Sequence, residues 1–320
     1  MYRIRRLSLT VTLLVLFACS PLVNLPGKQV TEPRIQNEVF VTGDGSLLPL
    51  RTWLPENCPV KAVIVALHGF NDYSNAFTSP SNYLKRRGIA CYAYDQRGFG
   101  GAPGRGFWSG IDAYTNDLST FVQEVRKRHP GVPLYIMGES MGGAVAIVAA
   151  TGKNPPEVDG VILVAPAVWG RVTMPWYQRC LLAITAHTIP WLKLTGKGMH
   201  ISPSDNIEML RALGRDPHVI RSTRVDTLYG LTNLMDEALS RAGKMQLPTI
   251  VLYGKNDQII PKEPTFLMLD KMPKSTRKAF YAHGYHMLLR DLQGKKPLAD
   301  IAVWIAGHNS PLPYGSDRWN

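Results

Sequence analysis

Short apolar runs alternate with amphipathic segments over most of this 320-residue chain. The pattern predicts strands at residues 60–67, 89–94, 134–137, 161–164, 249–253 and 278–281. Segments between them, such as 81–87 and 111–129, have the spacing of helices. Near-continuous apolar strands are typical of a parallel sheet buried on both faces, and their alternation with helices favours a doubly wound arrangement. We therefore predict an α/β fold with a mostly parallel sheet, preceded by an antiparallel hairpin, 38–41 and 47–54, around Gly43-Asp44-Gly45.

One section breaks this alternation. About eighty residues of helical character separate Pro166 from the strand that begins at Thr249, far more than a simple crossover needs. The interpretation is an inserted helical cap, 167–248, over the carboxyl ends of a core formed by residues 38–166 and 249–308. A pair of peripheral structural helices is the alternative.

The N-terminus has the pattern of a targeting segment. Arg3, Arg5 and Arg6 form a charged region, and the apolar run Leu7–Ala18 is too short to span a bilayer. The run ends in Leu16-Phe17-Ala18-Cys19, which resembles the lipobox of bacterial lipoproteins, although Phe17 is bulkier than the usual residue.

The lipobox resemblance implies cleavage before Cys19 and diacylation of that cysteine. Residues 1–18 would be the signal peptide and residues 19–37, which contain three prolines, a tether. The expected location is the bacterial cell envelope, as a membrane-anchored lipoprotein at the outer membrane or facing the periplasm. A plain secretory signal or an uncleaved anchor is the alternative.

The net charge indicates which classes of binding partner the protein favours. The formal net charge is +12, of which the leader arginines supply three, leaving +9. Basic residues form short clusters such as 85–87 and 126–128, and no nucleic-acid motif occurs, so the charge favours attraction to an anionic surface.

Three cysteines, Cys58, Cys91 and Cys180, remain after the leader. An odd number cannot pair completely, and Cys91 is expected to be a buried free thiol. No Cys/His spacing suggests a metal site.

The stretch 134–143 carries the strongest chemical signal. A strand-type run leads into Gly138-Glu139-Ser140-Met141-Gly142, and an apolar helix-type segment follows at once. This context predicts a nucleophile elbow, in which the serine hydroxyl projects above the sheet at the N-terminus of a helix. A glycine-rich loop before an ordinary helix is the alternative.

A serine nucleophile needs a base, and the base needs a carboxylate to orient it. In elbow-type hydrolases these follow in the order Ser, Asp, His. Asp257 and His286 have that order, each in a loop after a predicted strand. His283 is a competing base. Alternatively, Asp257 is a turn former and His286 is a solvated loop residue.

An oxyanion hole needs two N–H donors near the serine. We expect one from the backbone of Met141, which follows the nucleophile, and one from the backbone of Phe70 in the loop His68-Gly69-Phe70-Asn71. His68 is expected to pack and form hydrogen bonds beneath that loop.

These motifs, together with Tyr94-Asp95-Gln96-Arg97-Gly98-Phe99-Gly100, Gly254-Lys255-Asn256-Asp257 and Gly284-Tyr285-His286, resemble α/β-hydrolases of the monoacylglycerol lipase and lysophospholipase family. The resemblance covers residues 38–306. It implies the α/β-hydrolase fold and hydrolysis of lipid monoesters through an acyl-enzyme, without metal or organic cofactor. The expected partners are a lipid ester and a membrane surface, with no nucleic acid; no oligomeric state is predicted.

Two other functions remain possible on the sequence. A peptidase or amidase on this fold would need cap carboxylates for a free amine, and residues 167–204 contain none. A non-catalytic surface lipoprotein is the alternative from another class, against which the complete residue set argues.

The early cap combines large apolar residues with Arg179 and Lys193. We expect part of it to line an acyl-chain pocket and part to dock on lipid, because aromatic side chains and cations together suit the membrane interface. The pocket residues expected here are Trp169, Trp176, Leu181 and Trp191. Alternatively, these side chains pack into the cap's own core.

Overall fold

A nine-stranded sheet forms the centre of the protein in the computed structural model, which describes residues 20–196, 198 and 201–318. Its strand order is β1-β2-β3-β5-β4-β6-β7-β10-β11. The strands from β5 to β11 are mutually parallel, and β1, β2 and β3 are antiparallel. Their bounds are β1 (Arg34–Gln36), β2 (Val39–Val41), β3 (Leu47–Trp53), β4 (Ala62–Leu67), β5 (Ile89–Tyr94), β6 (Leu134–Glu139), β7 (Gly160–Val164), β10 (Thr249–Gly254) and β11 (Arg277–Tyr281). The predicted hairpin and mostly parallel sheet are confirmed.

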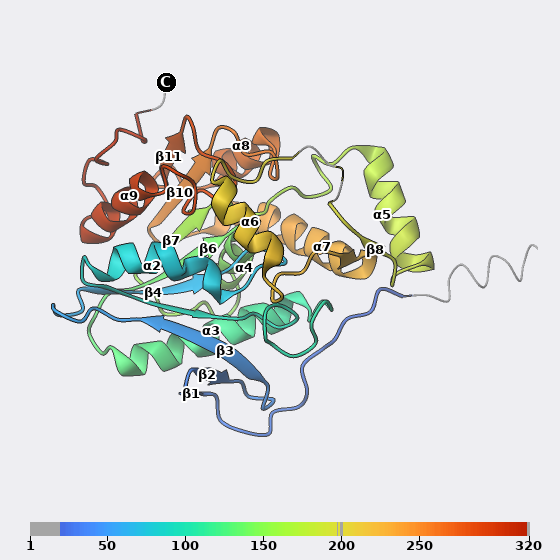
Figure 1. Ribbon diagram of the computed structural model, residues 1–320, viewed down its shortest axis with the longest axis horizontal. Helices are drawn as coiled ribbons and strands as arrows, with labels where there is room; N and C mark the ends of the chain where they lie inside the picture. The colour runs from blue at the N-terminus through green and yellow to red at the C-terminus, as the bar shows by residue number, and fades with distance from the viewer. Residues whose placement is uncertain (1–19, 197, 199–200, 319–320) are drawn as a thin grey trace, which may run out of the picture.

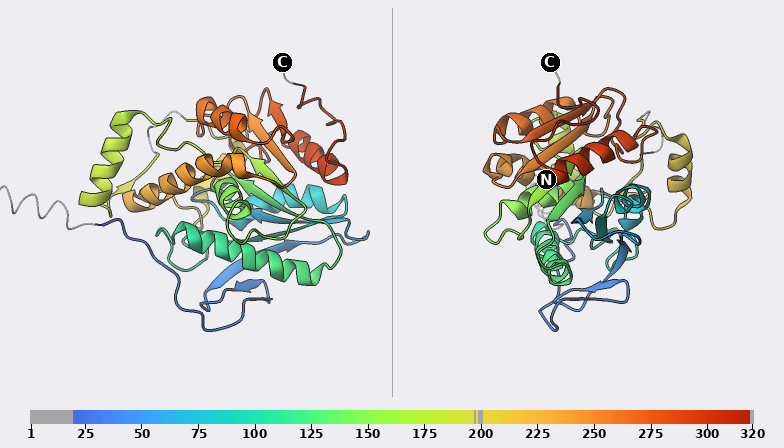
Figure 2. Two further views of the ribbon diagram at one scale, coloured as in Figure 1. Left: turned by 180° about the vertical axis from the view of Figure 1, so that it is seen from behind. Right: turned by 90° about the vertical axis from the view of Figure 1, so that its left-hand side faces the viewer.

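Helices cover both faces of the sheet. The helices that flank it outside the 167–248 segment are α2 (Thr78–Lys85), α3 (Ile111–Arg128), α4 (Met141–Ala150), α8 (Lys262–Lys271) and α9 (Lys295–Ala306), with the short 3-10 turn η1 (Ser74–Phe77). Alternate residues of β4 point to opposite cores: Val63, Val65 and Leu67 to one, Ala62, Ile64 and Ala66 to the other. The first core packs under α3, α4 and α8, and the second under α2 and α9. Figure 1 views the α2 and α9 side, and the left panel of Figure 2 views the opposite face.

Burial on both faces explains why the strand runs lack alternation. All six residues of β4, β5 and β10 are buried, so each position needs an apolar side chain. Cys91 in β5 is fully buried and unpaired, as expected, and burial raises the pKa of its thiol to about 12.

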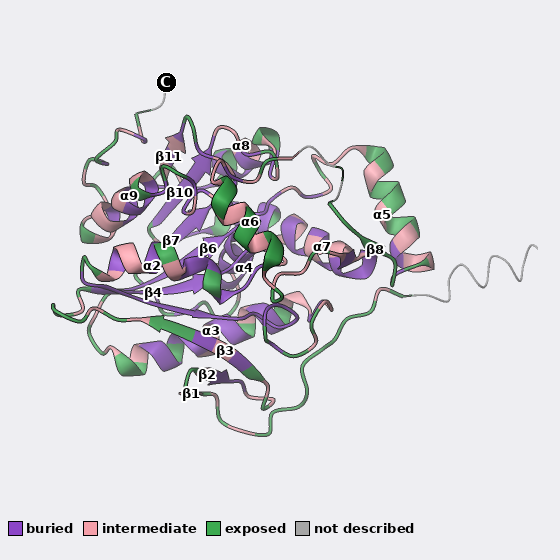
Figure 3. Ribbon diagram, viewed as in Figure 1, coloured by how far each residue is buried: buried purple, intermediate pink, exposed green. Residues whose placement is uncertain are grey.

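The segment between β7 and β10 divides into two parts. It contains α5 (Trp176–Thr188), β8 (Lys193–Leu194), α6 (Ile207–Arg215), β9 (Thr223–Arg224), α7 (Val225–Arg241) and η2 (Ala242–Lys244). Helix α7 packs against α4 and buries Leu234, Ala238 and Leu239 in the first core. Helices α5 and α6 lie outside the sheet's helical layers, and of their residues only Ala186 is buried (Figure 3). The apolar pattern predicted helices throughout this segment but did not separate the core helix from the cap helices.

The segment predicted as a tether, 19–37, lies against the core from the start of its described part. Val23 forms a parallel bridge with Trp108, and the Asn24 N–H donates to the Trp108 carbonyl at 2.7 Å. Residues 34–36 then form β1, so the sheet edge begins inside the predicted tether. The described chain starts beside α5 and β8 (Figures 1 and 2).

The predicted leader and Cys19 lie outside the described residues. Within residues 20–196 and 201–318, none of the helices combines the length and the apolar character needed to cross a bilayer.

Candidate active site

Ser140 occupies a sharp turn between β6 and α4. Its φ of 53° and ψ of −115° lie in a region that L-residues rarely adopt. The Ser140 N–H donates to the Val164 carbonyl at 2.9 Å, and its carbonyl accepts from the Ala144 N–H at 3.2 Å. A Cβ on Gly142 would lie 2.2 Å from the Leu67 carbonyl oxygen, so only glycine fits this crossing of backbone segments. The predicted strand-turn-helix context is therefore present.

Asp257 and His286 meet above the carboxyl ends of β10 and β11. The Asp257 Oδ1 accepts hydrogen bonds from the N–H groups of Ile259 and Ile260 at 2.8 and 2.9 Å. Its Oδ2 lies 2.8 Å from His286 Nδ1. Because a carboxylate can only accept, Nδ1 carries the proton and Nε2 is left as an acceptor. The two loops touch so closely that a Cβ on Gly254 would lie 2.4 Å from Gly284.

Ser140 and His286 line one cavity of about 170 Å³, and both residues are mostly buried. The structure thus brings together the serine, the histidine and, through the histidine, the aspartate. A carbonyl carbon that enters this cavity could approach the serine oxygen while Nε2 accepts the hydroxyl proton.

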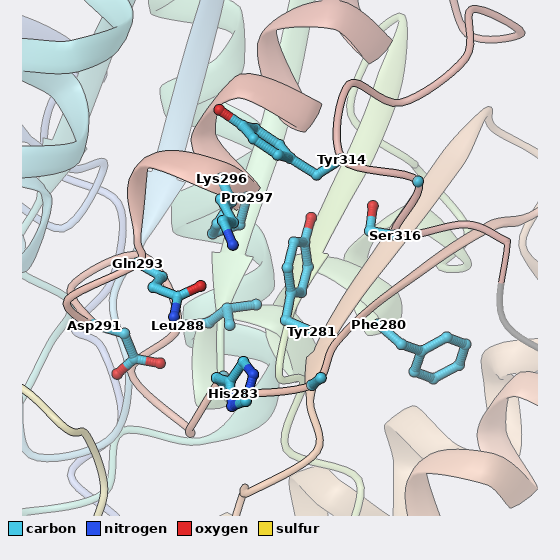
Figure 4. Close-up of a pocket in the computed structure, with 13 residues that line it drawn as sticks. Phe280, Tyr281, His283, Leu288, Asp291, Gln293, Lys296, Pro297, Tyr314 and Ser316 are labelled. Carbon is cyan, nitrogen blue, oxygen red and sulfur yellow. The ribbon is translucent and has the colours of Figure 1, made fainter.

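His283, the competing base, lies elsewhere. It lines a separate cavity of about 210 Å³ with Tyr281, Lys296 and Tyr314, shown in Figure 4. Only His286 of the two histidines shares a cavity with Ser140.

The loop after β4 forms the opposite wall of the cavity beside Ser140. Gly69 approaches the serine so closely that an added Cβ would lie 3.4 Å from the Ser140 Cβ. Phe70 lines the cavity, and Met141 begins α4. In the part of the chain that the structure describes, no hydrogen bond uses the N–H of Phe70 or of Met141. Both donors remain available to a developing oxyanion.

His68 supports this loop from below. Its ring is fully buried; Nε2 accepts from the Gln96 N–H at 2.9 Å and Nδ1 donates to the Gly69 carbonyl at 2.8 Å. Burial lowers the pKa of His68, so the imidazole is neutral at physiological pH. The expected packing role is confirmed.

A buried ion cluster beside Ser140 was not predicted from the sequence. An Arg290 guanidinium nitrogen lies 2.8 Å from Asp72 and 3.3 Å from Glu139, and all three side chains are at most 8% exposed. Burial opposes the charge of Arg290, but Glu139 and Asp72 outweigh it and raise its pKa above the ordinary value. The cluster joins the loop after β4, which we call the oxyanion loop, to the end of strand β6 and to the loop of His286. Glu139 was the available signal, because a carboxylate at the end of a buried strand requires a partner.

The acyl-pocket residues expected from the sequence do not line this cavity. Trp176, Leu181 and Trp191 are 69%, 62% and 56% exposed, and Trp169 packs against the first core. Leu213 of α6 and Val219, in the segment after it, provide the cap's apolar lining. The correction has a simple cause: α6 contributes Leu213 to the cavity of Ser140, whereas α5 projects to the side of the molecule (Figure 1).

Comparison with known proteins agrees with this geometry. A family described as serine aminopeptidase, S33 (Hydrolase_4) matches residues 58–293. Monoglyceride lipase of Rattus norvegicus is 27% identical over 274 residues, which cover 83% of this chain and 89% of that protein. Monoacylglycerol lipase of Mycolicibacterium smegmatis is 26% identical over 275 residues, covering 80% and 91%.

A solved structure has the same fold. A soluble variant of monoglyceride lipase from Saccharomyces cerevisiae, in complex with a substrate analogue, matches with a TM-score of 0.72 at 20% identity, covering 92% of this chain and all of that one. The matched family region contains Ser140, Asp257 and His286. The chain therefore belongs to the Hydrolase_4 family and has the α/β-hydrolase fold.

Proposed function

We propose that this protein is a serine hydrolase that cleaves carboxylic esters of lipid monoesters, monoacylglycerols or lysophospholipids. One observation carries the proposal: His286, hydrogen-bonded to Asp257 at 2.8 Å, shares a cavity with Ser140 in its strained turn. The monoglyceride lipases among the relatives support the choice of a lipid monoester.

In the proposed mechanism, the Ser140 oxygen attacks the ester carbonyl carbon while His286 Nε2 takes the hydroxyl proton. Asp257 stabilises the imidazolium that forms and holds its tautomer. The N–H groups of Phe70 and Met141 donate to the oxyanion. The ester carbon–oxygen bond then breaks, and His286 returns the proton to the leaving alcohol. Water, deprotonated by His286, then attacks the acyl carbon; the bond from that carbon to the Ser140 oxygen breaks, the fatty acid leaves, and His286 returns the proton to the serine oxygen.

An aminopeptidase is the second candidate, since the family description names that activity. It would need an uncompensated carboxylate to bind a free amine. Asp72 and Glu139 line the cavity, but both contact Arg290 and are nearly inaccessible. Ester hydrolysis needs no such group, so the site supports an esterase better. A non-catalytic surface lipoprotein is disfavoured because the strained turn at Ser140 would then be retained at a cost of roughly 1–3 kcal/mol for no purpose.

We further propose that the protein acts at a membrane of the bacterial cell envelope, with a lipidated Cys19 as its anchor. The exposed side chains of α5 support a docking role for the cap. Trp176, Tyr177, Leu181 and Ile184 are each more than half exposed. Aromatic and aliphatic side chains on one helix suit the boundary between head groups and acyl chains.

The activity is tested with a panel of monoacylglycerols, lysophospholipids, short soluble esters and aminoacyl amides on wild type and Ser140→Ala. Wild type should cleave the lipid monoesters, and Ser140→Ala should cleave none. Turnover of aminoacyl amides alone would favour the aminopeptidase instead.

Anchorage is tested with Cys19→Ser and mass spectrometry of the mature N-terminus. The variant should leave the membrane fraction or remain unprocessed. An unmodified mature N-terminus at another residue would contradict lipidation.

A further inference from the structure

A basic groove lies next to the catalytic cavity. It has a volume of about 480 Å³, and its lining includes Arg105, Lys193, Arg221 and Arg224. Neither Asp nor Glu is among its described lining residues. The four cations come from three parts of the chain: the loop before α3, strand β8 and the segment that joins α6 to α7.

Most of the cations in the groove are not neutralised by carboxylates, although backbone carbonyls fix the two arginines Arg105 and Arg221. Arg105 donates to the backbone carbonyls of Gly100 and Pro217 at 3.0 and 2.6 Å. Arg221 donates to the Gly214 carbonyl at 2.8 Å. Carbonyl oxygens fix a guanidinium but carry no net charge to cancel its own. Lys193 has no ion pair with any of the described residues.

One carboxylate does compensate part of the groove. Arg224 pairs with the buried Asp226. Asp216, the other nearby acid, faces away: it accepts from the Tyr73 hydroxyl at 2.6 Å and lines a neighbouring hollow. Three of the four cations therefore remain uncompensated.

The pairing of β8 with β9 adds an independent observation. Lys193 lies directly opposite Arg224 in this antiparallel pair. Like charges at opposite positions of an antiparallel pair repel and destabilise it. The strand pair consists of two residues on each side, and the Arg224–Asp226 ion pair offsets only part of that repulsion, because Lys193 has no carboxylate of its own. An anion between the two cations would remove the repulsion.

The groove adjoins the reaction site through one residue. Val219 lines both the groove and the cavity of Ser140. The next residue, Ile220, donates its N–H to the Asn71 carbonyl at 3.0 Å, which ties this wall to the oxyanion loop. The groove and the catalytic cavity are therefore adjacent, with Val219 in the lining of both.

We propose that the groove is a subsite for the phosphate of an anionic lysophospholipid whose acyl ester is held at Ser140. This inference rests on the proposed function and selects, among lipid monoesters, those in which a glycerol backbone joins the ester to a phosphate. Guanidinium and ammonium groups form strong charge-assisted hydrogen bonds with phosphate oxygens. A monoacylglycerol has no anionic group to pair with these cations.

The test compares monohexanoyl glycerol phosphate with monohexanoyl glycerol in solution without lipid, on wild type and on Lys193→Gln/Arg221→Gln. The double variant should lower kcat/KM for the phosphate ester by about tenfold or more, mainly through KM, and leave the neutral ester within about twofold. Added salt should act on the phosphate ester alone. Lys193→Arg/Arg221→Lys keeps both charges and should retain most of the wild-type selectivity.

Lys244→Gln/Lys274→Gln, which removes two exposed charges that do not line the groove, is the matched control and should change the hydrolysis of neither ester. Equal effects of the groove variant on both esters, or no effect on either, would overturn the subsite while leaving ester hydrolysis intact.

A binding arm separates this inference from the catalytic proposal. The hexyl ether of glycerol phosphate, which lacks a cleavable ester, is titrated into Ser140→Ala with and without the groove substitutions. Binding that weakens about tenfold with the substitutions supports the subsite even where no ester is hydrolysed. Unchanged ether binding, with reduced binding to phosphatidylglycerol vesicles, would instead make the groove a bilayer-lipid contact and overturn the substrate assignment.

Discussion

The catalytic cavity and the cap surface beside it differ in how their charged and apolar side chains are placed. Around Ser140, the charged side chains are buried and partnered: His286 with Asp257, and Arg290 with Asp72 and Glu139. On the cap, α5 exposes Trp176 and Leu181, and the basic groove leaves Lys193 and Arg221 without carboxylates. A site that performs chemistry requires groups held in one geometry, whereas a surface that receives a ligand or a membrane leaves groups available. The two regions should therefore respond differently to substitution.

The largest contrast is in activity. Ser140→Ala or His286→Ala should each lower kcat by about four orders of magnitude or more, and the double variant should be little worse, because the residues act as a unit. Steady-state hydrolysis of a short soluble ester measures the loss, and circular dichroism should show an unchanged fold. Multiplicative losses in the double variant would contradict a shared mechanism.

Removing the buried cation of the catalytic region should cost both stability and rate. Arg290→Met leaves Asp72 and Glu139 without a partner, so we expect a loss of about 3–5 kcal/mol in the free energy of unfolding. Arg290→Lys keeps the charge and should recover much of that stability. Because the cluster joins the loops of Phe70, Ser140 and His286, kcat should fall more than KM rises in both variants. Denaturant unfolding and steady-state kinetics provide the two measurements.

Helices α7 and α5 of the inserted segment offer a matched pair of stability tests. Leu234→Ala in α7 opens a cavity in the first core and should cost about 2–5 kcal/mol. Trp176→Ala in α5, 69% exposed, should change stability by less than about 0.5 kcal/mol but weaken binding to lipid vesicles. A large stability loss for Trp176→Ala would show that the aromatic packs in solution and is not free to dock.

Asp291 connects the two regions through hydrogen bonds. It accepts from the Ser204 hydroxyl of the cap segment at 2.6 Å and from the Tyr285 N–H beside His286 at 2.7 Å. Burial raises its pKa from 3.8 to about 6. Between these values the folded protein binds a proton that the unfolded chain does not, so this group's contribution to stability decreases as pH rises through that window.

Asp291→Asn removes this titration. Relative to wild type, the variant should gain about 2 kcal/mol between pH 4 and pH 7, measured as the difference in unfolding free energy. A constant difference across that range would mean that Asp291 has an ordinary pKa.

Local sequence patterns predicted most of the fold and the order of the candidate catalytic residues. The elbow around Ser140 is encoded by adjacent residues, and Asp257 and His286 each follow a strand whose apolar pattern is continuous. The cap was harder because its packing is decided by long-range contacts. Helix α7 and helix α5 have similar apolar content, yet one is a core helix and the other projects outward.

The same reason explains the residues that were missed. Leu213 and Val219 reach the cavity only through the tertiary placement of α6 and of the segment after it. Arg290 meets Asp72 across more than two hundred positions of the sequence. The β8–β9 pair has too few residues to produce an alternating pattern.

The course of the N-terminal segment limits how the protein could move on a membrane. Val23 forms a β-bridge with Trp108, and Asn24 forms a hydrogen bond with it. Of the described residues, only 20–22 lie between Cys19 and this attachment to the core. Three extended residues span roughly 10 Å. With Cys19 lipidated, as proposed, the body would diffuse in two dimensions with little rotational freedom, and the end that carries α5 and β8 would stay turned toward the bilayer, because the chain enters there (Figures 1 and 2). Such an enzyme would collect its substrate from lipid within reach of its own footprint rather than from bulk solution.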